Sequence, residues 1–335
     1  MKSKKESLKT DIPVLMYFNL DTLEWTEKDQ NDVLEDVLTL KQAMEKIGHQ
    51  VTPVQLSNSN INEVLNKYDP EEYIVFNWCE GIPGIPHSFA KAAQTLEELG
   101  FTFTGSASEV LELTDDKRRV KELLDFNRIS TPFWKVYQSS EIKDWDRFPA
   151  IVKPPCEHCS IGISPEAVVT NQDDLRKRAA FVIEEFHQPV IVEDFINGRE
   201  FEVGVWGNTE IKVLPPVEAD FRQLEDPRDH LCAMYSEDDP RLWKIIVPAP
   251  LNRKENGRLN QLCKDAYKAF GVHDYARMDV RFKDDVFYIL DVNTNPYIGP
   301  ECGMIQAAEL IGYSYGEFGS QLVNFAWQRK NIKVN

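Results

Sequence analysis

The sequence has no long apolar run and carries far fewer basic than acidic residues. No stretch approaches the roughly 18 apolar residues that a membrane-spanning helix needs, and the basic segment at residues 1–11 is not followed by the apolar core of a secretory signal. These absences argue against a membrane partner and against secretion. We therefore expect a cytoplasmic protein whose residues 1–12 form a disordered leader.

The shortage of basic residues also limits the partners. Lys and Arg number 38 against 55 Asp and Glu, which gives a net charge of −17. A nucleic-acid groove needs concentrated positive charge, so this composition argues against a nucleic-acid partner. In one interpretation the acidic excess serves only solubility, and in another it reflects a preference for cationic substrates. An enzyme of this composition that uses ATP has to gather its lysines locally.

Two motifs are incomplete or missing. Cys156 and Cys159 form a C-x-x-C with His158 between them, which is compatible with a zinc or redox site. A structural zinc site normally needs a second ligand pair at short spacing, and the sequence offers none. We therefore interpret the six cysteines as free thiols. No G-x-G-x-x-G follows the first predicted strand, which argues against a dinucleotide site there.

The length and the hydrophobic pattern predict several packed units. A chain of 335 residues is too long for one ordinary core. The N-terminal part alternates apolar strands with amphipathic helices, which is typical of a small doubly wound α/β unit. A charged helix over 111–127 follows, and the rest mixes strands with helices around a long acidic segment, 218–243, of the kind that forms lids or binding loops. The predicted N-terminal strands cover 13–18, 51–56 and 73–76, with a helix over 33–47 after the first strand and a helix over 88–99 after the third.

Near the C-terminus, charged residues alternate along two predicted strands. Arg277 and Asp279 lie on the first strand, Asp291 and Asn293 lie on the second, and a hairpin turn is predicted at 284–285. Residues two apart share a face of a strand, so the four side chains would face one space. Two carboxylates and an amide suit Mg²⁺, which takes few protein oxygens, and an Arg can stabilise an oxyanion. The alternative is a surface ladder of alternating charges.

A lysine ends an apolar strand upstream of this hairpin. Lys153 follows Ile151-Val152, and the loop after it contains Ser160 and Gly162. Such a loop can place backbone N–H groups over phosphates, and glycine allows the backbone to approach a ligand closely. Lysines also end many strands that bind nothing, so this cluster alone leaves both interpretations open.

A third cluster lies between the other two. The acidic residues Glu193 and Asp194 follow an apolar strand and precede Phe195, and Arg199-Glu200 comes shortly after. Backbone groups of such a segment could bind an adenine edge, and a carboxylate could bind a ribose hydroxyl. An exposed turn at Asn197-Gly198 is the alternative.

The order of the three clusters, with Asp116-Lys117 upstream, resembles the ATP-grasp superfamily and most closely its D-alanine–D-alanine ligase-like branch. The similarity runs from about Pro13 and is strongest from Thr114 onward. It implies an ATP-grasp fold in which an N-terminal α/β domain precedes two α+β lobes that hold ATP between them. These units would cover 13–110, 111–192 and 193–335.

The resemblance also implies roles for individual residues. Arg277, Lys153 and Ser160 would be catalytic, with Arg277 at the oxyanion. The lysines and the loop 157–162 would hold the phosphates, and two Mg²⁺ ions would be bound by Asp279, Asp291 and Asn293. The residues implied to contact ATP are Lys117, Lys153, Glu157, Ser160, Gly162, Glu193, Phe195, Glu200 and Leu290, with Glu193 and Phe195 beside the adenine and Glu200 on the ribose.

The substrate half departs from the named branch. The segment 17–21 lacks the glycine-rich pattern and its glutamate, and Tyr297 replaces a glycine. The serine that binds the acceptor carboxylate in that branch aligns with Cys302, whose thiol is a weaker hydrogen-bonding group. Asp238, after Tyr235, stands where a substrate-binding lysine is expected. We therefore expect the product to differ from D-Ala-D-Ala, and the acceptor to be neutral or cationic.

The implied activity is the ATP-dependent joining of a small-molecule carboxylate to an amine through an acyl-phosphate. A phosphotransferase that stops at the phosphorylated product is one alternative, and a nucleotide-binding regulatory protein with a decayed site is another. Cys79 ends a strand near the predicted cleft, where a role in the pocket wall is favoured over that of a nucleophile because the sequence offers no partnered His. The resemblance also suggests a homodimer.

Overall fold

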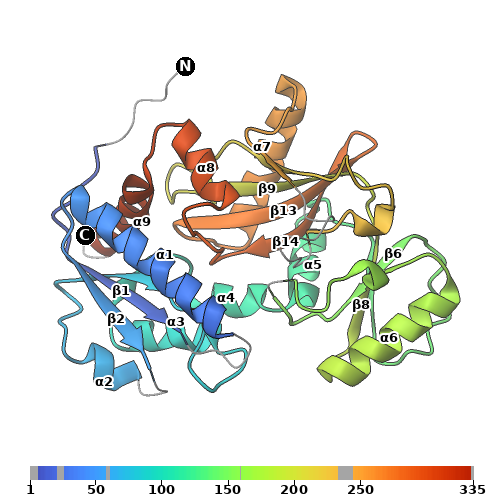
Figure 1. Ribbon diagram of the computed structural model, residues 1–335, viewed down its shortest axis with the longest axis horizontal. Helices are drawn as coiled ribbons and strands as arrows, with labels where there is room; N and C mark the ends of the chain where they lie inside the picture. The colour runs from blue at the N-terminus through green and yellow to red at the C-terminus, as the bar shows by residue number, and fades with distance from the viewer. Residues whose placement is uncertain (1–6, 21–25, 58–60, 159, 233–243, 333–335) are drawn as a thin grey trace.

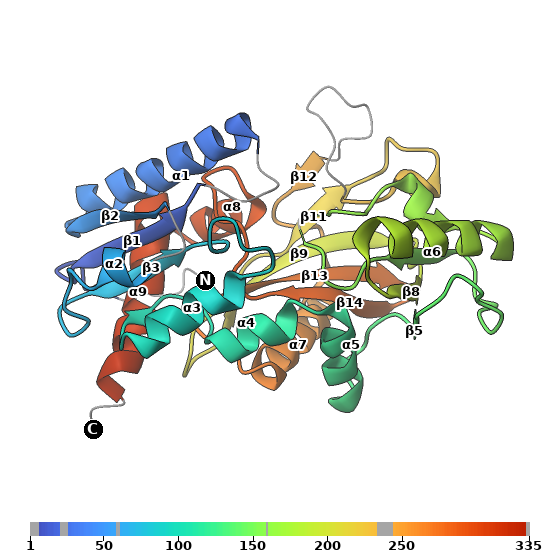
Figure 2. The same ribbon diagram turned by 90° about the horizontal axis from the view of Figure 1, so that it is seen from below.

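The structure, a computed structural model, describes residues 7–20, 26–57, 61–158, 160–232 and 244–332. Its strands form three sheets, of which the N-terminal one is parallel and the other two are antiparallel. The parallel sheet and the four-stranded antiparallel sheet lie toward opposite ends of the molecule, with the larger antiparallel sheet between them (Figures 1 and 2). The predicted combination of α/β and α+β units is confirmed. The predicted boundaries at 110 and 192 stay predictions.

The N-terminal sheet has the order β2-β1-β3-β4 with parallel neighbours throughout. All six residues of β1 are buried, as expected for a strand covered on both faces. Helix α1 begins six residues before the predicted start, because Thr26 and Asp29 form a capping box that stabilises a first turn without apolar residues. The elements are β1 (Val14–Asn19), α1 (Glu27–Lys46), β2 (Val51–Leu56), α2 (Ile61–Leu65), β3 (Ile74–Trp78), α3 (Phe89–Glu98) and β4 (Thr102–Phe103).

The predicted helix over 111–127 is wrong, because the chain forms two helices there. Helix α4 (Ser108–Thr114) ends before Asp115, and α5 (Lys117–Phe126) starts after Asp116. The Asp116 carboxylate accepts a hydrogen bond from the Arg118 backbone N–H, so it caps α5 and competes with continuation of the first helix. The break places Lys117 in the first turn of α5.

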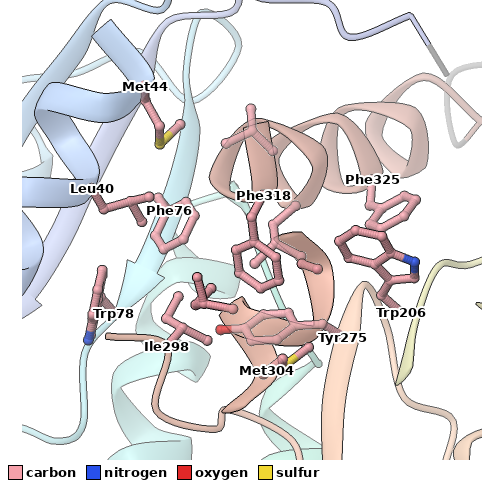
Figure 3. Packing of buried hydrophobic residues seen from close by; sticks show 14 of the residues in the cluster. Leu40, Met44, Phe76, Trp78, Trp206, Tyr275, Ile298, Met304, Phe318 and Phe325 are labelled. Carbon is pink, nitrogen blue, oxygen red and sulfur yellow. The ribbon is translucent and has the colours of Figure 1, made fainter. Parts of the chain in front are cut away.

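The last two helices pack on the N-terminal sheet, although they are distant from it in sequence. Helices α8 (Gly303–Leu310) and α9 (Tyr315–Ile332) share one core with β1, β3 and α1. Trp206, fully buried in this core, stacks on Phe318 with ring centroids 5.8 Å apart (Figure 3). Gly319 allows α9 to approach α1 closely, since an added Cβ would lie 2.9 Å from Met44 Sδ. Sequence periodicity missed α8.

The chain start also joins this core. The Lys9 backbone N–H donates to Asn324 Oδ1 at 2.9 Å, and Asn324 Nδ2 donates to the Lys9 backbone oxygen at 3.0 Å. Ile12 is buried. The expected disordered leader therefore does not describe residues 7–12, and residues 1–6 lie outside the described ranges.

The four-stranded antiparallel sheet has the order β5-β8-β6-β7. Helix α6 (Gln172–Phe186) packs on it, starts at the cap Asn171 and ends at His187, whose φ of 53° stops the helix in the left-handed region. The strands are β5 (Trp134–Tyr137), β6 (Ala150–Lys153), β7 (Val168–Val169) and β8 (Val190–Asp194).

The larger antiparallel sheet has the order β12-β11-β9-β13-β14, with β10 also paired to β9. Helix α7 (Arg253–Ala269) packs against it, and the predicted hairpin turn is confirmed, with positive φ at both Asp284 and Asp285. The strands are β9 (Arg199–Trp206), β10 (Lys212–Val213), β11 (Val217–Asp220), β12 (Lys244–Ile246), β13 (Tyr275–Lys283) and β14 (Val286–Asn293).

Among the described residues, no helix is long and apolar enough to cross a membrane.

Candidate active site

The two antiparallel sheets and the end of β3 enclose a cavity of about 630 Å³, which is within the usual range for a small-molecule site. It brings together most of the residues that the sequence singles out. Gly162, Cys79 and Cys302 lie outside its lining, and Tyr235 and Asp238 lie outside the described residues. The predicted residues that line the cavity are Lys117, Lys153, Glu157, Ser160, Glu193, Phe195, Glu200, Arg277, Asp279, Leu290, Asp291, Asn293 and Tyr297.

One part of the cavity is apolar. Phe195 is buried, and its ring lies 5.0 Å from the guanidinium carbon of Arg281. The cavity wall beside it is formed by Ile151, Ile163, Leu231 and Leu290, which come from both antiparallel sheets and their loops. An apolar wall with a cation–π pair at its edge suits a flat aromatic group.

Glu193 lies between two lysines. Its carboxylate oxygens are 2.9 Å from Lys121 Nζ and 2.8 Å from Lys153 Nζ, and both Glu193 and Lys121 are inaccessible to solvent. Burial acts to raise the pKa of Glu193, but the two ammonium groups outweigh it and lower this pKa. Burial lowers the pKa of Lys121, with Glu193 opposing. Glu193, which the resemblance places beside the adenine, therefore also fixes the position of the Lys153 ammonium.

The start of α5 brings a third lysine to the site. Lys117 Nζ donates to the Glu157 backbone oxygen at 2.6 Å and lies 3.4 Å from Asp291 Oδ2. Burial acts to raise the pKa of Asp291, but Lys117, Lys153 and His158 outweigh it and hold this pKa at about 2. Asp291 is therefore charged at neutral pH.

The predicted face of the β13–β14 hairpin is confirmed. Arg277 pairs with Asn293 across the hairpin and Asp279 pairs with Asp291. Arg277 Nε donates to Asp279 Oδ1 at 2.8 Å, and Asn293 Nδ2 donates to Asp279 Oδ2 at 2.9 Å. Burial, with Glu202 and Asp291, raises the pKa of Asp279 to about 6, although Arg277 acts in the opposite direction. The alternative of an exposed charge ladder is excluded, because these side chains line a cavity.

The donor set on this hairpin fits a magnesium ion. Asp279 and Asp291 offer hard carboxylate oxygens on adjacent strands, and the side-chain oxygen of Asn293 is left over when its nitrogen donates to Asp279. Burial and the neighbouring carboxylates of Glu202 and Asp291 raise the pKa of Asp279, and a divalent cation at this position would favour its charged form. In the described part of the chain, no group of three or more His, Cys, Asp or Glu has the arrangement of an all-protein metal site. The set therefore suits an ion that also takes oxygens from a ligand and from water.

The loop after β6 is held by side chains around it. Ser160 Oγ donates to the Cys232 backbone oxygen at 2.8 Å, and the Glu157 carboxylate accepts from Gln188. Gly162 has a φ of 75°, and an added Cβ would lie 2.9 Å from Pro154. Its lack of a side chain is thus required by the loop itself. Cys156 is a free thiol, and Cys159 lies outside the described residues.

Glu200, which the resemblance implies to bind a ribose hydroxyl, forms an ion pair with Arg281. Its Oε2 accepts from Arg281 Nε at 2.8 Å, and both residues are buried. Arg281 also donates to the Ile196 backbone oxygen at 2.8 Å, so it ties β13 to the segment after β8. Only the part of the Glu200 carboxylate not bound by Arg281 is left for a ligand.

Of the predicted substrate residues that the structure describes, Tyr297 lines the cavity and the two cysteines do not. Cys79 is fully buried, its Sγ donates to the Gly81 oxygen at 3.1 Å, and burial raises its thiol pKa to about 12. Such a thiol is a poor nucleophile, and Cys79, which lies outside the cavity lining, packs in the apolar core of the N-terminal domain. Burial raises the pKa of Cys302, which precedes α8, to about 11. Tyr297 donates its hydroxyl to Asp36 on α1.

Sequence reasoning missed several residues of the site. Lys121 could have been suspected, because it lies four residues after Lys117 on the apolar face of α5. Glu202 alternates with Glu200 along β9, and its Oε1 lies 3.6 Å from Arg277 Nη1. Glu80 is the first charged residue after β3 and lines the cavity.

Known proteins are similar to this chain in sequence and in fold. Residues 122–324, more than half of the chain, match the family model described as D-ala D-ala ligase C-terminus. The uncharacterized protein y4sG of Sinorhizobium fredii is 28% identical over 299 residues, 86% of each chain. A D-alanine–D-alanine ligase of Marinomonas sp. is 27% identical over 293 residues, 84% of this chain and 87% of that protein.

A solved structure agrees with these relatives. The D-alanine–D-alanine ligase from Bacillus anthracis, crystallised with ATP, superposes with a TM-score of 0.75 at 19% identity and covers 96% of this chain and 99% of that one. The likeness shows that the fold is the predicted ATP-grasp fold. The chain therefore belongs to the D-ala D-ala ligase C-terminus family of ATP-grasp ligases.

Proposed function

We propose that this protein joins a carboxylate to an amine at the expense of ATP, through an acyl-phosphate intermediate, with release of ADP and phosphate. The observation that carries the proposal is the position of Arg277. It lies on the same strand face as Asp279 and in the same cavity as Lys117 and Lys153. A single cavity thus combines cations for phosphates with a donor suited to a carbonyl oxyanion.

ATP fits the two ends of this cavity. Its adenine would enter the apolar part at Phe195 and Leu290, and its phosphates would lie near Lys117 and Lys153. The relative from Bacillus anthracis that was crystallised with ATP supports this assignment. The ion pair of Lys153 with Glu193 sets the ammonium in place before the nucleotide arrives, which lowers the cost of ordering it.

Magnesium belongs to the same proposal. Asp279, Asp291 and Asn293 would hold two ions between the hairpin and the triphosphate, as their oxygen chemistry allows. Bound there, the metal would supply neutralisation of phosphate charge.

The residues of the chain then divide the work of the reaction. Lys117 and Lys153 hold the triphosphate while the substrate carboxylate attacks the γ-phosphorus in line, which forms the acyl-phosphate and ADP. The loop 157–162 covers the intermediate and excludes water. The amine nitrogen then attacks the acyl carbon, Arg277 donates hydrogen bonds to the oxygen that becomes negative, and the C–O bond to phosphate breaks. Loss of the extra amine proton completes the amide.

We further infer that the acceptor is neutral or cationic. Cys302 stands where the resemblance places a serine that binds the acceptor carboxylate, and a thiol forms weaker hydrogen bonds than a hydroxyl. The cavity lining also carries more carboxylates than basic groups. An acceptor with a free carboxylate would meet repulsion there. A broad amine panel tests this inference, and exclusive use of free α-amino acids as acceptors would contradict it.

Product analysis tests the reaction class. Phosphate release from Mg-ATP should require both a pool of carboxylates and a pool of amines, and mass spectrometry should find an adduct one water lighter than its parents. Arg277→Ala is the matched control, since it should remove the adduct while ADP still binds. Release that needs one pool only, with a stable phosphorylated product, would instead make the protein a phosphotransferase.

A further inference from the structure

Glu80 lies at the point where the order of the parallel sheet reverses. Strand β1 pairs with β2 on one side and with β3 on the other, so the carboxyl ends of β1 and β3 border a crevice of the kind that binds ligands in open α/β sheets. Glu80 follows β3 by two residues. Its backbone N–H donates to Asn19 Oδ1 at 2.8 Å, and Asn19, the last residue of β1, is fully buried. The position of Glu80 is therefore fixed by the sheet.

The Glu80 carboxylate differs from the other carboxylates of the cavity. In the ranges that the structure describes, it has no ion pair and accepts no hydrogen bond. Every other Asp or Glu of the lining has a partner. These pairs are Asp115 with His158, Glu157 with Gln188, Glu193 with Lys121 and Lys153, Asp194 with Arg147, Glu200 with Arg281, Glu202 and Asp279 with Arg277, and Asp291 with Lys117.

Among the residues with described positions, no cation forms an ion pair with the Glu80 carboxylate. Burial raises its pKa to about 7, and the charge of His158 acts in the opposite direction. Its charge also acts on Tyr275 and Cys79, both neutral at physiological pH. Asn19 Nδ2 beside it has no hydrogen-bond partner among the described residues. A carboxylate held in a cavity without a counter-charge favours binding of a cation.

We propose that Glu80 binds an ammonium group of a substrate and thereby selects substrates that carry one. The inference rests on the proposed ligase function and names the substrate class. A single carboxylate without a neighbouring unpaired acceptor suits a compact ammonium. The ammonium could be carried by the molecule whose carboxylate is phosphorylated or by the amine that attacks the acyl-phosphate.

Hydroxylamine separates these two sources. It captures acyl-phosphates as hydroxamates and is largely uncharged at neutral pH, so it serves as an acceptor without an ammonium. We would assay the wild type and Glu80→Gln with Mg-ATP in three arms: pooled amino acids with hydroxylamine, pooled simple carboxylic acids with hydroxylamine, and the active carboxylate pool with pooled amines. Glu98→Gln, an exposed change at the end of α3, is the control.

The expected result is a rise in KM of about 10- to 100-fold in Glu80→Gln for the ammonium-bearing partner, since a hydrogen bond to a charged group is lost. Affinity for ADP, measured by calorimetry, should not change. A rise confined to pooled amino acids assigns the ammonium to the phosphorylated substrate, and one confined to pooled amines assigns it to the acceptor.

Other results would overturn the proposal. Unchanged KM values in every active arm would show that Glu80 binds no substrate ammonium. An equal loss with simple carboxylic acids and hydroxylamine, or a parallel loss of ADP affinity, would show that Glu80 acts on the fold or on phosphoryl transfer. The absence of any hydroxamate from the wild-type protein would instead count against the proposed ligase function, because no acyl-phosphate would then form.

Discussion

The ammonium of Lys121 lies 2.9 Å from a carboxylate oxygen of Glu193, and neither side chain is accessible to water. The second oxygen of Glu193 holds Lys153 at 2.8 Å. Because Lys121 also compensates the charge of Glu193, Glu193 does not neutralise Lys153 alone, and the Lys153 ammonium can still attract an anionic ligand. A buried pair of this kind adds little net stability, but loss of one member leaves an uncompensated charge.

Lys121→Met should consequently destabilise the fold by about 3–5 kcal/mol. It should also weaken nucleotide binding, because Glu193 would then draw its compensation from Lys153 alone. Denaturant unfolding and ADP calorimetry measure the two effects. Lys177→Met, on the exposed side of α6, is the control and should change neither. Retention of full stability by Lys121→Met would contradict the role assigned to this pair.

Arg277→Ala should lower kcat by about 100- to 1,000-fold, the usual cost of losing a donor to an oxyanion. Its assigned role lies in the transition state, so the affinity for ADP should change little. Arg277→Lys should recover little of the rate, since an ammonium cannot reproduce the two hydrogen bonds to Asp279. Equal losses of kcat and ADP affinity would make Arg277 a structural residue.

The hairpin and the strand ending at Lys153 could be predicted from sequence, because strand alternation is local and fixes which side chains share a face. The pairing of Lys121 with Glu193 could not, since it joins a helix and a strand 72 positions apart. The break before α5 was missed for a related reason: Asp115 and Asp116 are compatible with a continuous charged helix, and only the cap formed by Asp116 ends it.

The substrate half was harder to predict than the nucleotide half. Glu80 carries no motif, and its significance comes from the reversal of strand order and from the absence of a partner in three dimensions. Helix α8 has only eight residues, of which Gly303, Met304, Ile305, Ala307 and Ala308 are buried, so it is too short to show the repeating apolar stripe by which an amphipathic helix is recognised. The sequence pattern thus identified residues that share a strand or a loop, and it missed residues whose role depends on contacts between distant segments.

Trp206→Ala should destabilise the protein by about 3–5 kcal/mol, because it opens a cavity in a close-packed core. The Trp206 ring contacts Tyr313, Phe318 and Phe325, which belong to the segment that covers the N-terminal sheet. Figure 3 shows Phe318 and Phe325 beside this ring. The m-value and the midpoint of urea unfolding measure the change. Phe126→Ala, at a side chain that is 84% exposed, is the control and should shift stability by less than about 0.5 kcal/mol. Similar effects of the two changes would mean that Trp206 does not hold this core together.

Glu80 should make the ligand-free protein less stable as pH rises. Its pKa is raised from 4.5 to about 7 in the folded protein, so between these values the folded state binds more protons than the unfolded state, and the free energy of unfolding falls with increasing pH. Glu80→Gln removes this cost. It should therefore raise the free energy of unfolding at pH 8 by about 1–3 kcal/mol relative to the wild type, and by much less at pH 5. Urea unfolding at the two pH values measures the difference, with Glu98→Gln as the exposed control. A stabilisation of equal size at both pH values would show that the effect comes from the amide and not from removal of the charge.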